Sequence, residues 1–120
     1  MKTVLFVDAN LKDVQIFFIM NQIFMKEALK LVAAFDAADA ASKAAASSPP
    51  DVILIKYASD TLDILKRNKA STNIPAIVLL PKGSSANYQQ KMKDAGAIDA
   101  VNMDQFSILQ IIDKARAILG

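Results

Sequence analysis

Three short runs rich in β-branched and other apolar residues constrain the fold of this chain more than any other feature. They are Val4–Val7, Asp51–Tyr57 and Pro75–Leu80. Such near-continuous apolar runs are typical of strands that are buried on both faces of a parallel sheet. They therefore predict central strands, and the weaker segments Leu29–Phe35 and Ile98–Asn102 are expected to be edge strands of the same sheet.

Helical segments alternate with these strands along the chain. We expect helices at Leu11–Lys26, Ala37–Ser47, Thr61–Asn68, Ser85–Ala95 and Gln105–Leu119. A strictly alternating series with short connections predicts a parallel sheet covered by helices on both faces and joined by right-handed crossovers. The fold class is thus a doubly wound α/β sandwich of five strands and five helices. We find no interdomain linker, so residues 1–120 are expected to form a single domain.

Side chains at the helix ends are suited to cap them. Asp36, Asp60, Ser84 and Asp104 each precede a helical segment and can accept hydrogen bonds from its first free amides. Gly96 follows the fourth helix, where a left-handed residue is favoured.

Composition excludes several classes of function. The chain has 14 Lys and Arg against 12 Asp and Glu, and the basic residues are scattered, so a nucleic-acid surface is not expected. It has no Cys and no His. Disulfides, thiolate zinc sites, thiol nucleophiles and the commonest acid–base side chain are therefore excluded.

The most apolar stretch does not predict a membrane span. Val14–Met25 is interrupted by Gln15, Asn21 and Gln22, and it falls well short of the about 20 apolar residues that a span needs. The N-terminus also lacks the plan of a signal peptide. We expect a cytoplasmic protein.

Ligands of doubly wound sheets bind at the carboxyl ends of the strands, near the point where the strand order reverses. In this chain those ends follow Val7, Ile55 and Leu79. The residues at these three positions are therefore expected to decide the function.

Four segments carry a resemblance to a known family. They are Val4–Asp8, Pro50–Ile55, Ile74–Leu79 and Asp94–Asp99. In them the chain resembles the receiver domain of bacterial two-component response regulators, and the resemblance extends over Val4–Leu119. It implies a flavodoxin-like sheet of order 2-1-3-4-5, a role in signal transduction or a phosphorelay, and phosphorylation of an aspartate at the end of the third strand.

The matching residue at that strand end is Lys56, and the other functional positions of the family also differ. Receivers hold Mg²⁺ with two adjacent acids after the first strand, whereas Asp8 is followed here by Ala9, which leaves one carboxylate. Leu80 replaces the hydroxyl residue of the fourth strand, and Met103 replaces the lysine that follows the fifth strand.

Two further differences concern the switch and a loop. Ala100 stands at the position of the aromatic switch residue, and the loop Tyr57–Asp60 is short and lacks the family's Met-Pro pair. We therefore interpret the chain as a degenerate pseudo-receiver that works without aspartyl phosphorylation, metal or cofactor.

Lys56 and Asp8 are expected to lie side by side at the crevice. We expect a structural ion pair, in which the ammonium neutralises Asp8 where the family has magnesium. The alternative is a catalytic lysine that attacks a carbonyl, but a nearby carboxylate favours the charged ammonium, which is not nucleophilic.

The expected function is protein–protein interaction in signalling, without catalysis. The candidate partner surface includes Tyr88 and Lys91 on the fourth helix and the polar side of the last helix. Apolar residues of the first helix exceed a single stripe, so a second copy of the chain is also a candidate partner. Two alternatives stay open: a small-molecule-binding or lysine-dependent enzyme of flavodoxin-like fold, and an excised or engineered receiver scaffold without native function.

Overall fold

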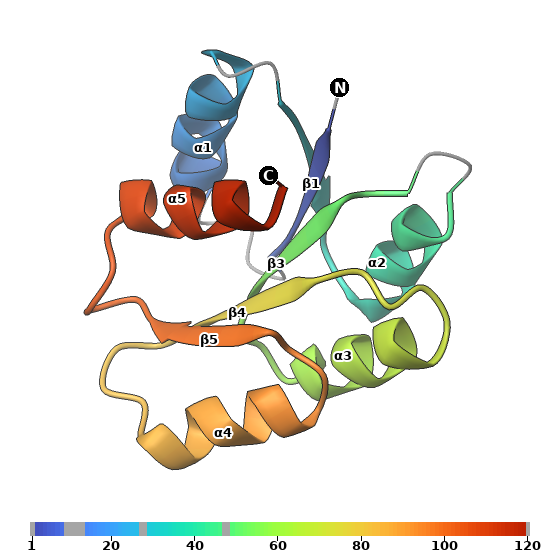
Figure 1. Cartoon of the computed structure of the whole chain (residues 1–120), viewed down its shortest axis with the longest axis vertical. Coiled ribbons are helices and arrows are strands. Elements are labelled where there is room, and N and C mark those ends of the chain that lie inside the picture. Colours follow the sequence, from blue (N-terminus) through green and yellow to red (C-terminus); the bar gives the residue numbers. More distant parts are fainter. Residues whose placement is uncertain (1, 9–13, 27–28, 47–48, 120) are drawn as a thin grey trace.

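The computed structural model describes residues 2–8, 14–26, 29–46 and 49–119 (Figure 1). Strands and helices alternate along the chain. The elements are β1 (Thr3–Val7), α1 (Val14–Lys26), β2 (Lys30–Ala34), α2 (Ala37–Ala44), β3 (Val52–Lys56), α3 (Thr61–Ala70), β4 (Ala76–Leu80), α4 (Ala86–Asp94), β5 (Asp99–Asn102) and α5 (Ile108–Leu119). No helix within these ranges is long and apolar enough to cross a membrane.

The five strands form one parallel sheet of order β2-β1-β3-β4-β5. Val7 lies opposite Ala34 on β2 and Ile55 on β3, and Leu80 lies opposite Asn102 on β5. The predicted fold class, the predicted strand order and the placing of β2 and β5 at the edges are confirmed.

Successive residues of each central strand pack into different halves of the core. Figure 1 shows α1 and α5 on one face of the sheet, and α2, α3 and α4 on the other. The first half of the core includes Val4, Phe6, Leu54, Leu79 and Ile112. The second half includes Leu5, Ile53, Val78, Leu80 and Met92. Because strand side chains alternate between faces, a strand covered on both sides must be apolar at every position, which explains the continuous runs.

Helix α5 begins later than the sequence suggests. The predicted start at Gln105 with Asp104 as its cap is wrong, because the helix begins at Ile108. Ser107 caps it instead: the N–H of Gln110 donates to Ser107 Oγ at 3.2 Å, and the N–H of Ser107 donates to Gln110 Oε1 at 2.8 Å. This reciprocal pair is a capping box, which satisfies two amides and outcompetes a single carboxylate upstream.

Two other predicted caps bind elsewhere. Ser84 does not cap α4, because Ser85 holds the cap position and the Ser84 hydroxyl donates to the carbonyl of Pro81 at 2.8 Å. Asp60 does stand at the start of α3, but its carboxylate accepts from the N–H of Ala37 on α2 at 2.9 Å. It therefore binds the first amide of a different helix.

The remaining end signals are confirmed. Asp36 accepts from the N–H of Asp39 at 2.7 Å and caps α2. Gly96 has a φ of +120°, and the N–H of Ala97 donates to the carbonyl of Met92 at 3.0 Å to close α4. A side chain is disfavoured at such a φ, so glycine is required there.

Two helix ends differ from the predicted bounds. Helix α2 stops at Ala44, short of the predicted Ser47, which lies outside the described residues. Ala45 and Ala46 are exposed, so helix propensity there is not supported by packing. Helix α3 continues two residues past the predicted end at Asn68, and the N–H of Ser71 donates to the carbonyl of Arg67.

Candidate functional site

The carboxyl ends of β1 and β3 lie next to each other in the middle of the sheet. Val7 is opposite Ile55, so the next residues, Asp8 and Lys56, follow side by side where the two strands end. Both residues are partly buried. The structure thus brings together the two residues that the sequence placed at the crevice, and the ion pair between them stays a prediction.

Backbone hydrogen bonds keep the strands in register beyond this point. The N–H of Asp8 donates to the carbonyl of Ala34 at 2.9 Å, and the N–H of Tyr57 donates to the carbonyl of Leu79 at 2.9 Å. The positions of Asp8 and Lys56 are therefore defined by the sheet itself. Ala9, the other predicted site residue of the first loop, lies outside the described residues.

Within the described ranges, no three His, Cys, Asp or Glu side chains come close enough together to hold a metal ion. Lys56 places an ammonium at the end of β3, where a hard cation would require oxygen ligands.

Leu80 and Ala100 contribute no polar atom to the crevice. Leu80 is fully buried at the end of β4, and Ala100 is buried on β5. Both belong to the half of the core under α4, together with the fully buried Met92. Where the family resemblance implies a hydroxyl and a mobile aromatic ring, this chain has closely packed apolar groups.

Met103 also faces the core. Its side chain is partly buried against the half of the core that lies under α1 and α5, and its N–H donates to the carbonyl of Leu80 at 3.0 Å. The next residue, Asp104, accepts from the N–H of Gly83 at 3.3 Å. The end of β5 therefore offers no ammonium to a bound anion, and its one carboxylate binds the loop after β4.

Asn102 is a site residue that the sequence pattern did not predict. Only 5% of it is exposed, and its amide donates to the carbonyl of Ser84 at 2.8 Å. Its Oδ1 accepts from Gln89 Nε2 on α4 at 3.4 Å. Asn102 and Asp104 together hold the β4–α4 loop against the end of β5. The only signal in the sequence is one amide residue at the end of an apolar strand.

Tyr88 and Lys91, the candidate partner residues, are exposed on α4. The ring of Tyr88 also meets the ring of Tyr57 edge to face, with centroids 6.1 Å apart and planes at 89°. Aromatic pairs favour this geometry. The contact joins α4 to the loop that follows Lys56.

One titrating carboxylate lies at the start of β5, at the other end of the strand from Asn102. Lys114 on α5 donates to Asp99 Oδ2 at 2.8 Å, and the N–H of Ala100 donates to Oδ1 at 2.9 Å. Partial burial raises the pKa of Asp99, but these two donors and the charge of Lys93 outweigh it, so the pKa lies below its usual value. Lys114 also lies 5.0 Å from the centroid of the Phe106 ring.

No protein-family model matches the chain, and no curated protein matches it in sequence. Solved structures do match. The receiver domain of the Francisella response regulator 1452 superposes with a TM-score of 0.81 at 23% identity, over 98% of this chain and 96% of that chain. The chain has the receiver-domain fold.

Two further structures agree. A two-component response regulator from Clostridium difficile has a TM-score of 0.82 at 16% identity, over 99% of this chain and 96% of that chain. The Vibrio cholerae chemotaxis protein CheY4 has a TM-score of 0.76 at 21% identity, over 98% of both chains. At these identities the likeness establishes the CheY-like, flavodoxin-like fold, and function has to come from the site residues.

Proposed function

We propose that this chain is a receiver-like signalling module that binds a protein partner without being phosphorylated on aspartate. The observation that carries the proposal is the side chain at the end of β3. In a receiver-like fold this strand end would hold the phosphoryl acceptor, and here it holds Lys56.

The chemistry of Lys56 supports the proposal. A carboxylate can attack a phosphoryl donor because it has a negative charge and lone pairs that a cation organises, whereas an ammonium has no free lone pair. The groups around it agree, since the side chains of Leu80 and Met103 pack in the core and offer no donor to phosphoryl oxygens.

The packing around α4 supports binding in one constitutive conformation. Asn102 and Asp104 hold the β4–α4 loop, and the Tyr57–Tyr88 contact holds α4 against the next loop. The exposed side of α4, with Tyr88 and Lys91, then has the same shape whether or not a signal is present. We propose this side and the polar face of α5 as the partner surface.

We also propose that the chain catalyses no reaction. The alternative, a lysine-dependent enzyme, needs a neutral amine at Lys56 and a pocket for a carbonyl compound beside it. The ion pair predicted between Lys56 and Asp8 would leave the lysine no free lone pair for such an attack. Ile19 and Met25 on α1 are apolar and exposed. A second copy of the chain that covers them is therefore another candidate partner.

One mass-spectrometric experiment separates these functions. We expect no phosphoryl adduct after incubation with acetyl phosphate and Mg²⁺, under conditions in which an aspartate-bearing receiver domain is fully modified. We also expect no reducible imine on Lys56 after incubation with small aldehydes and borohydride. A phosphoryl group on Asp8 would contradict the proposal, and an imine confined to Lys56 would favour the enzyme.

A further inference from the structure

Strand β2 forms one edge of the sheet and has a row of backbone groups directed away from β1. The N–H of Lys30 donates to the carbonyl of Lys2, and the carbonyl of Ala34 accepts from the N–H of Asp8; these two partners flank β1. Since alternate residues of a strand direct their backbone groups to opposite sides, the groups of Leu31, Ala33 and Phe35 face away from β1, where the described residues add no further strand. An open edge of this kind can pair with a strand of another chain.

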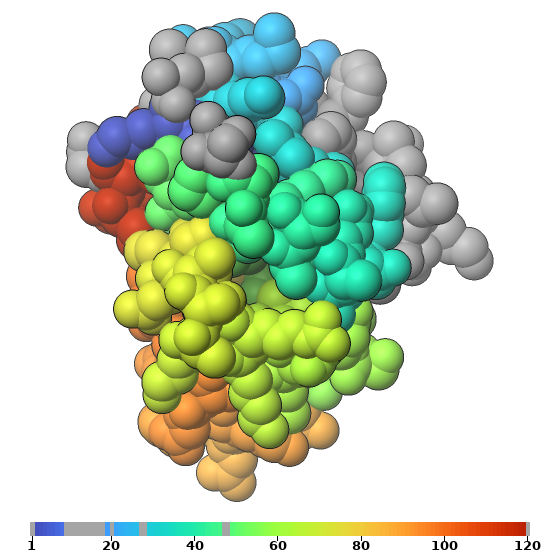
Figure 2. Space-filling model, turned by 90° about the vertical axis from the view of Figure 1, so that its right-hand side faces the viewer, coloured from blue at the N-terminus to red at the C-terminus, as the bar shows by residue number. Residues whose placement is uncertain are grey.

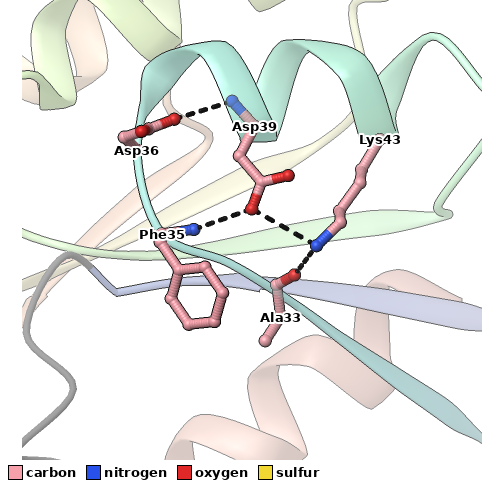
Figure 3. A network of polar contacts seen from close by, with 5 residues as sticks. All are labelled: Ala33, Phe35, Asp36, Asp39 and Lys43. Atoms are coloured by element: carbon pink, nitrogen blue, oxygen red, sulfur yellow. Dashed lines mark hydrogen bonds and ion pairs between the residues drawn. The ribbon is translucent and has the colours of Figure 1, made fainter.

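Two side chains of α2 occupy part of this edge (Figure 3). Asp39 Oδ2 accepts from the N–H of Phe35 at 3.1 Å, and the ammonium of Lys43 donates to the carbonyl of Ala33. The two side chains also bind each other, with Lys43 Nζ 3.3 Å from Asp39 Oδ2. One ion pair therefore satisfies an edge-facing carbonyl and an edge-facing amide.

These are the two groups that one residue of an additional parallel strand would bind. Beside Ala34, such a residue would donate its N–H to the carbonyl of Ala33 and accept from the N–H of Phe35. Lys43 supplies the donor and Asp39 supplies the acceptor. The ion pair thus reproduces the hydrogen bonds of a neighbouring strand with two side chains.

The covered segment is one that needs such protection. Leu31–Phe35 reads Leu-Val-Ala-Ala-Phe and contains no charge. Phe35 is 49% exposed, and Lys43 Nζ lies 5.8 Å from the centroid of its ring. Uncharged apolar segments at a sheet edge favour pairing between chains, and natural proteins often block them with charged side chains, lysine in particular.

We infer that the Asp39–Lys43 pair is an edge cap, which keeps β2 from pairing with the β2 edge of a second copy of this chain. A second copy is the expected occupant because each copy carries the same edge. Two identical edges can pair antiparallel about a two-fold axis, and that pairing also needs the Ala33 carbonyl and the Phe35 amide. This inference does not depend on the proposed function.

A charge exchange tests the cap. The double variant Asp39→Lys with Lys43→Asp keeps an ion pair and the net charge, but places a donor at the Phe35 amide and an acceptor at the Ala33 carbonyl. We expect hydrogen exchange of the Phe35 amide, followed by NMR, to become about tenfold faster. We also expect sedimentation equilibrium to show more self-association of the double variant than of the unaltered chain at the same concentration.

The matched control is the Asp63–Arg67 pair on α3. It has the same i,i+4 spacing at 3.2 Å, and its acid and base also lie in the first and last turns. The double variant Asp63→Lys with Arg67→Asp therefore has the same unfavourable effect on the helix dipole. Phe35 exchange and the degree of self-association should be the same in this control as in the unaltered chain.

A second pair of variants keeps the test decisive if the exchanged chain does not fold. Asp39→Asn retains an oxygen acceptor and should keep most of the Phe35 protection, whereas Asp39→Leu removes the acceptor and should lose it. Equal exchange in the two variants would overturn the inference. The inference would also be overturned if the unaltered chain self-associated through β2. The same holds if the double variant with swapped charges stayed monomeric while its Phe35 amide lost protection.

Discussion

Lys56 is the residue that separates this chain chemically from the receivers it resembles. It lies partly buried at the end of β3, one position beyond the Val7–Ile55 pair, with Asp8 next to it. A positive charge at this point can neutralise Asp8 without a metal ion. A variant with an aspartate in place of Lys56 lacks this positive charge.

We therefore predict that Lys56→Asp destabilises the fold and does not restore phosphorylation. Two neighbouring carboxylates disfavour each other's ionisation, and the loss of a partly buried partner costs about 1 to 3 kcal/mol of unfolding free energy. Urea unfolding at pH 7 measures the loss, which should decrease in acid as carboxylates are protonated. Acetyl phosphate should still give no adduct, because Leu80 and Met103 supply no donor.

Lys56→Met provides the control, since it removes the ammonium without adding a second carboxylate. It should be less destabilising than Lys56→Asp at pH 7. Equal stability of the unaltered chain and Lys56→Asp would show that Lys56 does not pair with Asp8.

Helix α5 shows how an element's boundary depends on its cap. Ser107 and Gln110 exchange two hydrogen bonds at its start, whereas Asp104, the expected cap, binds the Gly83 amide. Both residues belong to types that favour helix starts, so composition does not distinguish them. The capping box does, because it needs a Gln or Glu three residues after the Ser.

We predict that Ser107→Ala lowers the free energy of unfolding by about 1 kcal/mol, which is the usual effect of losing an N-cap. Asp104→Ala should change it by less than about 0.5 kcal/mol, because the residue is exposed and outside the helix. Chemical denaturation of the two variants compares them directly. An unchanged free energy of unfolding for Ser107→Ala would contradict the role of Ser107 as the cap of α5.

For the whole molecule, the stability should depend little on pH near neutrality. The chain contains no His, and His is the side chain that normally titrates between about pH 5 and 8. In acid, Asp99 should make the free energy of unfolding depend on pH, because its pKa is lowered in the folded state. A lowered pKa gives stability that is present above about pH 4, the unfolded value, and is lost as the pH falls through the folded value.

Asp99→Asn should therefore destabilise the protein at pH 7 by at most about 1 kcal/mol, since the pair with Lys114 is partly exposed. The difference from the unaltered chain should vanish at the lowest pH at which folding persists. Repeating the substitution in a Lys114→Gln background should reduce its effect at pH 7. If Asp99→Asn has the same effect in both backgrounds, the stability comes from the hydrogen bond between the Ala100 amide and Asp99 instead.

The sequence by itself determined the layers of this protein and which residues stand at the carboxyl ends of its strands. Strands such as Val52–Lys56 were recognisable because burial on both faces demands apolar residues at every position. Their alternation with helices led to the parallel sheet, and Gly96 marked a helix end because few other residues adopt its backbone conformation. The register of neighbouring strand ends followed, which placed Lys56 beside Asp8.

Only the tertiary structure decided which backbone groups the polar side chains bind. Asp60 stands at the start of its own helix but binds Ala37, 23 residues away, and Asn102 binds Ser84 across two elements. The Asp39–Lys43 pair looks like an ordinary helix ion pair until β2 is placed beside it. Sequence spacing specifies partners within one helix turn, whereas a hydrogen bond between elements depends on how those elements pack, which is set by the shared core.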